Sequence, residues 1–358
     1  MTEVREELKY IVVGALGLVG RAVVEALEDQ DGCEVVAVSR RQPDFPTRAG
    51  FLQLDLTDRE ACRQQLGRLE GVTHIVYAAL YEKPDLIAGW RDDEQVETNT
   101  RMLANVLDFV VPARHFTLLQ GTKAYGAHLA PMKLPGKESD PRHPGANFYW
   151  SQEDLVREAS AGAGWTFSIM RPQIVCGHAL GSPMNMVSAI GVHAAVLREL
   201  GQPLRFPGRG GFVTEATDAR LLARAILWAG SEPRCAGETF NITNGDILDW
   251  GALFPEFADH FQMRCAAPEP LQLSEAMPKH NGVWERIVAR HRLAPHSMDQ
   301  LIGASWQFAD AVFGYHGGQT TLLSAIKARQ FGFADCIDTG AMFREHFKAL
   351  QAHKVLPP

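Results

Sequence analysis

The stretch KYIVVGALGLVG, residues 9–20, decides the fold. Its first five residues form a short apolar run that predicts a buried strand, and glycines follow at positions 14, 17 and 20. With this spacing the first glycine permits a tight turn, the second lets backbone approach a pyrophosphate, and the third lets a helix pack close to the sheet. The helix expected at 21–27 would offer free N–H groups to phosphates. A turn without a ligand could carry the same glycines, but the strand–helix series behind it favours a dinucleotide site.

The rest of the chain repeats the alternation of strand and helix. Apolar segments that predict strands lie at residues 34–41, 51–56, 74–79, 115–120, 166–171 and 239–242. Helical patterns lie at 98–111, 149–159 and 213–228. Near-continuous apolar strands separated by helices predict an α/β fold, a Rossmann-type doubly wound parallel sheet covered on both faces.

The alternation ends after Pro172, and the following residues are rich in Pro, Gly, Trp and Met. We therefore expect a dinucleotide-binding domain and a smaller, mainly helical substrate-binding cap. The domain would span 1–175 with a returning segment at 213–245, the cap 176–212 and 246–330, and a C-terminal segment 331–358.

Composition argues against several other classes of protein. The 358-residue chain has a net charge of −7 and a pI of about 6.0, which gives no support to nucleic-acid binding. The opening MTEVREELK is too charged for a signal peptide, and no apolar run reaches the roughly 20 residues of a membrane span. The six cysteines are widely spaced and the thirteen histidines show no zinc-ligand spacing, so we expect no metal and a cytoplasmic protein.

The end of the second predicted strand bears on the choice of cofactor. A carboxylate there binds the ribose 2′-hydroxyl of NAD, whereas an arginine accommodates the 2′-phosphate of NADP. Here the strand ends Ser39-Arg40-Arg41, and guanidinium groups suit phosphate, so NADPH is favoured over NADH. Two exposed arginines could also be merely solvated. Asp55, after the third strand, could meet the adenine or cap the turn at Thr57.

Tyr149 stands about 130 residues after the glycine loop, in NFYWSQED at 147–154. In most short-chain dehydrogenases a lysine follows the catalytic tyrosine by one helical turn, but position 153 is glutamate here. The lysine in a suitable place is Lys123, in QGTKAYG at 120–126. Tyr149 could instead be an aromatic that packs on the sheet, Lys123 a solvated loop lysine, and Asn99 either an active-site asparagine or a helix cap.

These residues resemble those of the progesterone 5β-reductase and iridoid synthase-like enone reductases, an atypical branch of the extended short-chain dehydrogenases. The NFY segment with Glu153-Asp154 and the relocated lysine carries the resemblance most specifically. Further similar segments are the 14–20 loop, Ser39-Arg40-Arg41, and residues 71–77, 99–107, 121–125, 165–172, 182–186, 206–208, 240–246 and 331–333.

The resemblance implies that Tyr149 and Lys123 are the catalytic pair of an NADPH-dependent reductase of activated C=C bonds. The expected cofactor contacts are Gly14, Gly17, Leu18, Val19, Gly20, Ser39, Arg40, Arg41, Asp55, Leu56, Ala78, Gln120, Tyr149, Val175, Ser182 and Met184. Where the family has a second tyrosine this chain has Trp150, and Trp306-Gln307-Phe308 also departs from the family pattern. We expect the substrate to be bordered by Phe148, Trp150, Met186, Trp306 and Phe308.

The expected reaction is hydride addition to the β-carbon of an α,β-unsaturated carbonyl compound, a steroid, a monoterpenoid or a small enone or enal. A tyrosine hydroxyl would then donate to the enolate oxygen, and a lysine cation would stabilise its charge. One alternative is a nucleotide-sugar epimerase or dehydratase of the same fold, which needs its lysine at position 153. Another is a non-catalytic sensor of NADP(H). The resemblance implies a small-molecule partner and a homodimer.

Overall fold

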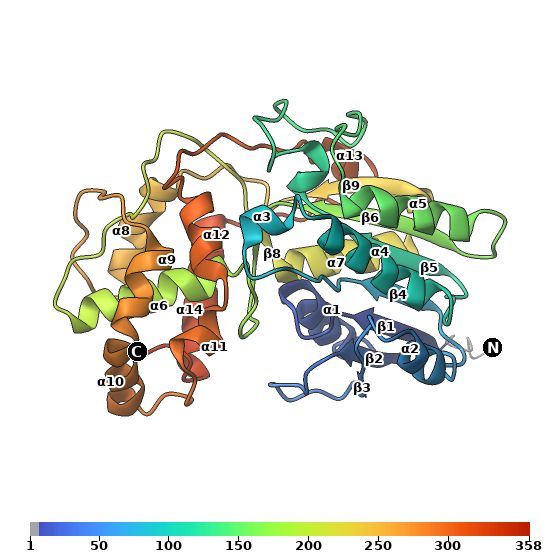
Figure 1. Cartoon of the computed structure of the whole chain (residues 1–358), viewed down its shortest axis with the longest axis horizontal. Coiled ribbons are helices and arrows are strands. Elements are labelled where there is room, and N and C mark those ends of the chain that lie inside the picture. Colours follow the sequence, from blue (N-terminus) through green and yellow to red (C-terminus); the bar gives the residue numbers. More distant parts are fainter. Residues whose placement is uncertain (1–6) are drawn as a thin grey trace. The chain divides into compact units, whose positions relative to one another are not determined.

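The computed structural model describes residues 7–358, so most of the charged segment at the start of the chain lies outside the described residues. A seven-stranded sheet with the order β3-β2-β1-β4-β5-β6-β9 organises the first part of the fold (Figure 1). Every neighbouring pair in it is parallel. This confirms the predicted Rossmann-type sheet. Its strands are β1 (Leu8–Val13), β2 (Cys33–Ser39), β3 (Gly50–Gln53), β4 (His74–Tyr77), β5 (His115–Leu119), β6 (Thr166–Pro172) and β9 (Glu238–Ile242).

Helices cover the sheet because each presents one apolar face to it. The helices α2 (Arg59–Leu66), α4 (Asp93–Leu107) and α5 (Phe148–Ser160) pack side by side, and α1 (Leu18–Glu28) packs on α7 (Ala219–Ser231). Apolar side chains of α2, α4, α5 and the sheet form one buried cluster, which includes Ile11, Leu103 and Val156. The shorter elements of this part are α3 (Leu86–Gly89), α13 (Ile326–Gln330), η1 (Thr122–Tyr125) and η2 (Pro233–Cys235).

Two helices begin elsewhere than the sequence pattern predicts. The helix expected at 98–111 spans Asp93–Leu107, because the carboxylate of Asp92 accepts from the amides of Glu94 and Gln95 and starts the helix earlier. The helix expected at 213–228 begins only at Ala219. The two residues before it form the strand β8 (Thr217–Asp218), which pairs with β7 (Val175–Cys176) and cannot be helical at the same time.

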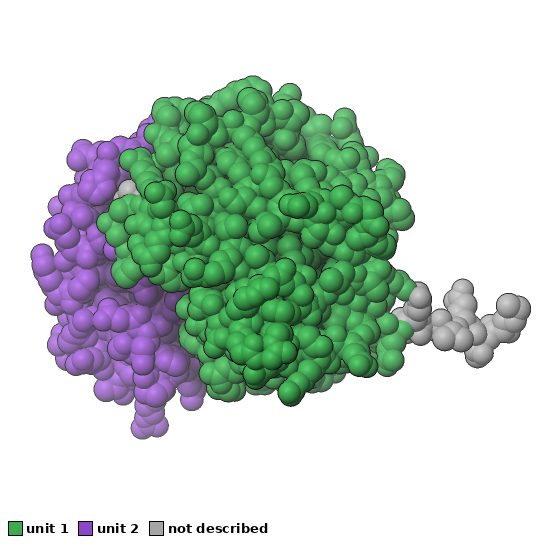
Figure 2. All heavy atoms as spheres, turned by 45° about the vertical axis from the view of Figure 1, so that its right-hand side comes forward, with its two compact units in different colours: residues 1–173, 219–242, 323–334 green, residues 174–218, 243–322, 335–358 purple. Residues whose placement is uncertain are grey.

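The chain divides into two compact units (Figure 2). Unit 1 comprises residues 1–173, 219–242 and 323–334, and unit 2 comprises 174–218, 243–322 and 335–358. The predicted boundaries differ from these at the returning segment and at the C-terminal segment, which is not a separate part. Residues 331–334 of that segment follow α13 in unit 1, whereas α14 (Thr339–Ala352) packs on α6 (Met186–Glu199) and α8 (Trp250–His260) of unit 2.

Unit 2 is mainly helical, and its core is rich in aromatic rings. Trp250, Phe254, Phe257, Phe343 and Phe347 contact one another within it. Its remaining helices are α6 (Met186–Glu199), α8 (Trp250–His260), α9 (Leu273–Ala276), η3 (Met277–His280), α10 (Asn281–His291), α11 (Met298–Ile302) and α12 (Ser305–Val312). Within residues 7–358, we find no helix with the length and apolar character needed to cross a bilayer.

Candidate functional site

The glycine loop has the geometry that its spacing predicts. Gly14 has a φ of +85°, and a Cβ placed on it would lie 2.7 Å from backbone atoms of Ala78 at the end of β4. A Cβ on Gly20 would lie 2.2 Å from the carbonyl oxygen of Gly14, so only glycine lets α1 sit this close to the loop. A Cβ on Gly17 would meet nothing nearer than 3.4 Å. The first and third glycines therefore serve packing, while the second leaves its face of the loop open.

The start of α1 suits an anionic ligand. Its N-cap is Gly17, which has no side chain to bond the first amides, and the first turn holds no acidic residue. The amide of Arg21 is bonded to the Gly17 carbonyl oxygen, so the amides of residues 18–20 precede the intrahelical hydrogen bonds. The sheet order also reverses at β1 and β4, the place where doubly wound sheets bind nucleotides. These residues fit the pyrophosphate of a dinucleotide.

The two arginines proposed for the 2′-phosphate follow β2 and are both exposed. Arg40 lies close enough to Asp55 to influence its carboxyl group. Burial tends to raise the pKa of Asp55, but bonds from Thr57 and the charge of Arg40 bring it below its usual value. Asp55 accepts from the amide and the hydroxyl of Thr57 at 2.9 and 2.8 Å, while the N-cap of α2 is Asp58. Asp55 thus holds the turn that precedes α2.

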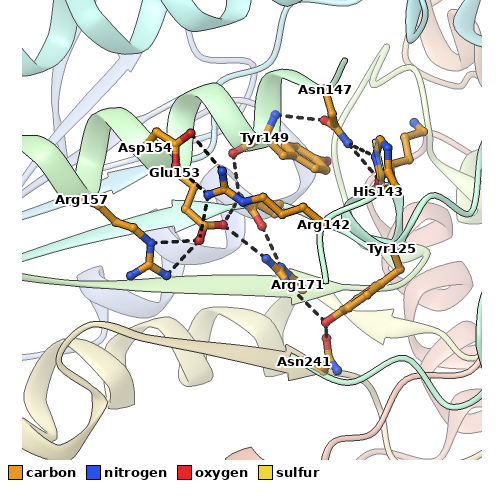
Figure 3. A network of polar contacts seen from close by, with 12 residues as sticks. Tyr125, Arg142, His143, Asn147, Tyr149, Glu153, Asp154, Arg157, Arg171 and Asn241 are labelled. Carbon is orange, nitrogen blue, oxygen red and sulfur yellow. Dashed lines mark hydrogen bonds and ion pairs between the residues drawn. The ribbon is translucent and has the colours of Figure 1, made fainter. Parts of the chain in front are cut away.

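One buried side chain ties Tyr149 to Lys123. Tyr149 is the second residue of α5, whose N-cap is Asn147, and Lys123 lies in the 3-10 turn η1 after β5. The Asn147 Oδ1 accepts from the Tyr149 amide at 3.0 Å (Figure 3). Its Nδ2 donates to the Lys123 carbonyl oxygen at 2.9 Å. Asn147 is only 4% exposed. The start of α5 and the turn after β5 are therefore fixed against each other.

The side chains of Tyr149 and Lys123 meet at a buried indole. The Lys123 Nζ lies 3.6 Å from the ring centroid of Trp90, and the Tyr149 ring packs edge-on at 5.2 Å from the same centroid. Trp90 Nε1 donates to Glu82 Oε1 at 2.9 Å. Lys123 is thus not the freely solvated lysine of the alternative interpretation. The phenol, from the start of α5, and the ammonium, from the turn after β5, converge on one side chain.

The surroundings adjust the protonation of both groups. Burial lowers the pKa of Lys123 to about 8, and the charge of Glu82 opposes this effect. Burial and then Glu82 raise the pKa of Tyr149, while Arg171 lowers it. At neutral pH the tyrosine is therefore a hydrogen-bond donor and the lysine a cation.

Position 153, one helical turn after Tyr149, belongs to an ionic network (Figure 3). Glu153 accepts from Arg157 at 3.0 Å, and its carboxylate pairs with Arg142 and Arg171, each at 3.3 Å. Burial raises the pKa of Glu153, but the bond from Arg157 and the arginine charges lower it below its usual value. The position is structural and leaves no room for a catalytic lysine.

Gln120, expected to contact the cofactor, also serves this network. Its Nε2 donates to the Tyr149 carbonyl oxygen at 3.0 Å and to Glu153 at 3.2 Å, and its Oε1 accepts from Arg171 at 2.8 Å. The side chain is 5% exposed and is engaged in this network, and the expected contact of Gln120 with the cofactor stays a prediction. Asn99 lies inside α4 and bonds the backbone of Tyr81, which rules out the helix-cap interpretation.

The other predicted site residues divide between the units. Phe148 is 2% exposed and packs on Trp90, so it backs the site, and the half-buried Trp150 stands beside Arg142. Ser39, Leu56 and Ala78 lie at or just beyond strand ends in unit 1. Unit 2 holds Val175, Ser182, Met184, Met186, Trp306 and Phe308. Of these, Met186 and Trp306 are 0% and 5% exposed and belong to its core.

Four residues of the site were not predicted from the sequence: Glu82, Trp90, Asn147 and His128. Asn147 could have been recognised as an N-cap from its place before a helical pattern. His128 packs edge-on against Trp90 at 5.8 Å, and both of its ring nitrogens are buried with no hydrogen-bond partner within residues 7–358. Nothing in the local sequence distinguishes Glu82 or Trp90 from ordinary loop residues.

Comparison with known proteins places the chain. Residues 10–243 match the NAD dependent epimerase/dehydratase family. The chain is 31% identical to an (S)-8-oxocitronellyl enol synthase of Antirrhinum majus over 372 residues, covering 97% of this chain and 92% of that protein. It is also 31% identical to a 3-oxo-Delta(4,5)-steroid 5-beta-reductase of Arabidopsis thaliana over 376 residues, with the same coverage of 97% and 92%.

Solved structures agree on the fold. A UDP-glucose 4-epimerase of Thermotoga maritima superposes with a TM-score of 0.68 at 16% identity, covering 96% of this chain and 99% of that one. The chain therefore belongs to the NAD dependent epimerase/dehydratase family of extended short-chain dehydrogenases and, within it, to the group that contains the (S)-8-oxocitronellyl enol synthases and the 3-oxo-Delta(4,5)-steroid 5-beta-reductases.

Proposed function

We propose that this protein catalyses the NADPH-dependent 1,4-reduction of an activated C=C bond in an α,β-unsaturated carbonyl compound. The observation that carries the proposal is the arrangement of Tyr149 and Lys123 around Trp90, with Glu153 in place of the usual lysine. The 31% identity to a steroid 5-beta-reductase and to an 8-oxocitronellyl enol synthase supports the same class of substrate.

NADPH would supply the hydride when bound, held at its phosphates by the glycine loop and α1 and at its 2′-phosphate by Arg40 and Arg41. The protein's own residues would then stabilise the negative charge that develops on the carbonyl oxygen. Tyr149 stays protonated because burial raises its pKa, so its hydroxyl can donate to this oxygen. One such donor contributes about 10²–10³ in rate.

Lys123 would add a positive charge beside the developing enolate. Partial burial would strengthen the attraction between this cation and the enolate, because water screens the two charges less where it is excluded. The Lys123 ammonium packs on an indole face, an arrangement that holds a cation without neutralising it. Phe148 and Trp90 pack on each other and are buried, so they would form an apolar backing that limits access of water to the oxygen.

A nucleotide-sugar epimerase or dehydratase is the second candidate, because the family name and the solved structures include such enzymes. Glu153 argues against it, since its buried ion pairs occupy the place of the lysine that such enzymes need. A sensor of NADP(H) that lacks activity would not need a tyrosine and a lysine at one indole.

The test is NADPH oxidation with 2-cyclohexen-1-one, progesterone and a dialdehyde monoterpene. We expect turnover with at least one acceptor, and a fall of about 10²–10³-fold in Tyr149→Phe. Tyr10→Phe is the matched control, because Tyr10 is buried in β1 and stacks on His74. NADPH binding without turnover on any enone would favour the sensor, and turnover of a UDP-sugar would favour the epimerase.

A further inference from the structure

Lys123 is held in an unusual way for a buried cation. Among the residues that the structure describes, no carboxylate forms an ion pair with its ammonium, which lies 3.6 Å from the centroid of the Trp90 ring. An ion pair would use the N–H donors and neutralise the charge, whereas an indole face attracts the cation and leaves its donors free. The Trp90 indole thus holds the Lys123 ammonium in place, as a carboxylate does in a salt bridge, but leaves its charge uncompensated.

The indole is itself fixed by a carboxylate. Trp90 is 3% exposed, and its Nε1 donates to Glu82 Oε1 at 2.9 Å. The other oxygen of Glu82 is buried and has no hydrogen-bond partner among the described residues. A bond to a carboxylate is stronger than one to a neutral acceptor, so it holds the ring in one orientation. Burial raises the pKa of Glu82, while the charge of Lys123 and the bond from Trp90 oppose this effect.

We infer that Glu82 and Trp90 are positioning residues for Lys123: the carboxylate orients the indole, and the indole face holds the ammonium in its charged form beside Tyr149. This inference extends the proposed function and rests on it, because Glu82 and Trp90 matter for catalysis only if Lys123 is catalytic. The same carboxylate acts on both reactive groups, since the charge of Glu82 raises the pKa of Lys123 and that of Tyr149. Both are thereby kept protonated.

The other titratable groups around Lys123 do not lose a proton in the same pH range. His128, from the loop after η1, has its pKa lowered to about 4, by burial and then by the charges of Lys123, His143 and Arg91. Burial also lowers the pKa of His143. Tyr149 has its pKa raised and is influenced by Arg171. A deprotonation near pH 8 in this cluster therefore belongs to Lys123, whose pKa is about 8.

The experiment follows this deprotonation directly. Protein carrying ¹³Cε-labelled lysine is titrated by NMR, and the Lys123 signal is assigned by its loss in Lys123→Met. We expect the Lys123 titration to move to lower pH in Glu82→Gln and in Trp90→Leu. Trp90→Phe, which keeps an aromatic face, should restore most of the Trp90→Leu shift. Glu138→Gln is the control for Glu82→Gln, because Glu138 is another partly buried carboxylate of unit 1. Trp228→Phe is the control for the Trp90 variants, because Trp228 packs on Phe240.

The kinetic readout uses whichever enone is turned over. We expect kcat to fall about 2- to 30-fold in Trp90→Leu, the range of a cation–π contact, and less in Trp90→Phe. An unchanged Lys123 titration in both Glu82→Gln and Trp90→Leu overturns the inference. If Glu82→Gln does not fold, the Lys123 titrations in Trp90→Leu and Trp90→Phe decide the outcome by themselves. Absence of enone turnover with a shifted titration would reject the proposed function and leave the positioning roles standing.

Discussion

Replacing Asn147 by alanine removes three hydrogen bonds of one buried side chain, one of which joins its Nδ2 to His143 Nε2 at 3.1 Å. The Tyr149 amide loses its N-cap acceptor, and the Lys123 carbonyl oxygen loses its donor. Loss of an N-cap costs about 0.5–2 kcal/mol, and a buried acceptor without a partner costs about 1–3 kcal/mol. We therefore expect the free energy of unfolding to fall by about 2–4 kcal/mol.

The effect on catalysis should exceed the effect on folding, because the bonds to Tyr149 and Lys123 position reactive residues. A displacement of about 1 Å in an active site can cost about 10²-fold in rate, so we expect kcat to fall by about that factor where the protein is still folded. Asn147→Ser should keep the bond to the Tyr149 amide and lose the one to Lys123, with an intermediate loss of stability. Stability is measured by urea unfolding followed by circular dichroism, and kcat by NADPH oxidation.

Asp58→Ala is the matched control for Asn147. Asp58 is the N-cap of α2 and accepts from the Ala61 amide at 2.9 Å, on a helix without predicted catalytic residues. This variant should lose about 0.5–2 kcal/mol and keep its kcat. If Asn147→Ala retains a kcat within about twofold of the wild type and is no less stable than Asp58→Ala, the proposed link between Tyr149 and Lys123 is wrong.

Three further predictions concern the charged residues. Arg40→Ala with Arg41→Ala should raise the KM for NADPH much more than that for NADH, whereas Arg63→Ala on the surface of α2 should change neither; equal effects on both cofactors would refute the 2′-phosphate assignment. Glu153→Lys should lower the unfolding free energy by about 3–5 kcal/mol, because it breaks buried ion pairs and adds a cation among three arginines, and Glu153→Gln should lose less. Since the pKa of Lys123 is about 8, kcat should fall as the pH rises through that value and the cation is lost. Lys123→Arg, which stays charged, should lack this limb; a limb that persists in it would belong to another group.

The local sequence was sufficient to predict the glycine loop and the parallel sheet. Gly14, Gly17 and Gly20 predicted the turn, and their positions in the structure match the roles of the first and third. The apolar strands predicted a parallel sheet, and the absence of lysine at position 153 favoured Lys123 as the catalytic lysine. Such inferences succeed because they depend on neighbours in sequence or on a backbone geometry that only glycine permits.

Features that depend on partners from distant parts of the chain could not be predicted. Gln120 is bound to Arg171, a residue 51 positions away, and its expected contact with the cofactor stays a prediction. The helix expected at 213–228 begins only at Ala219, because the two residues before it form a strand that pairs with Val175–Cys176. A local pattern cannot predict such pairings, because the competing contact exists only after the chain has folded.

The sequence by itself determined that this chain forms a doubly wound sheet with a nucleotide loop, since alternating apolar segments and glycine spacing act over short distances. Tertiary structure decided what surrounds Tyr149 and Lys123. Only folding brings Glu82 and Trp90 from one connection, Lys123 from another and Tyr149 from a helix start to a common place. The pKa of each group depends on burial and on charges that are close in space, so the chemistry of the site arises from that convergence.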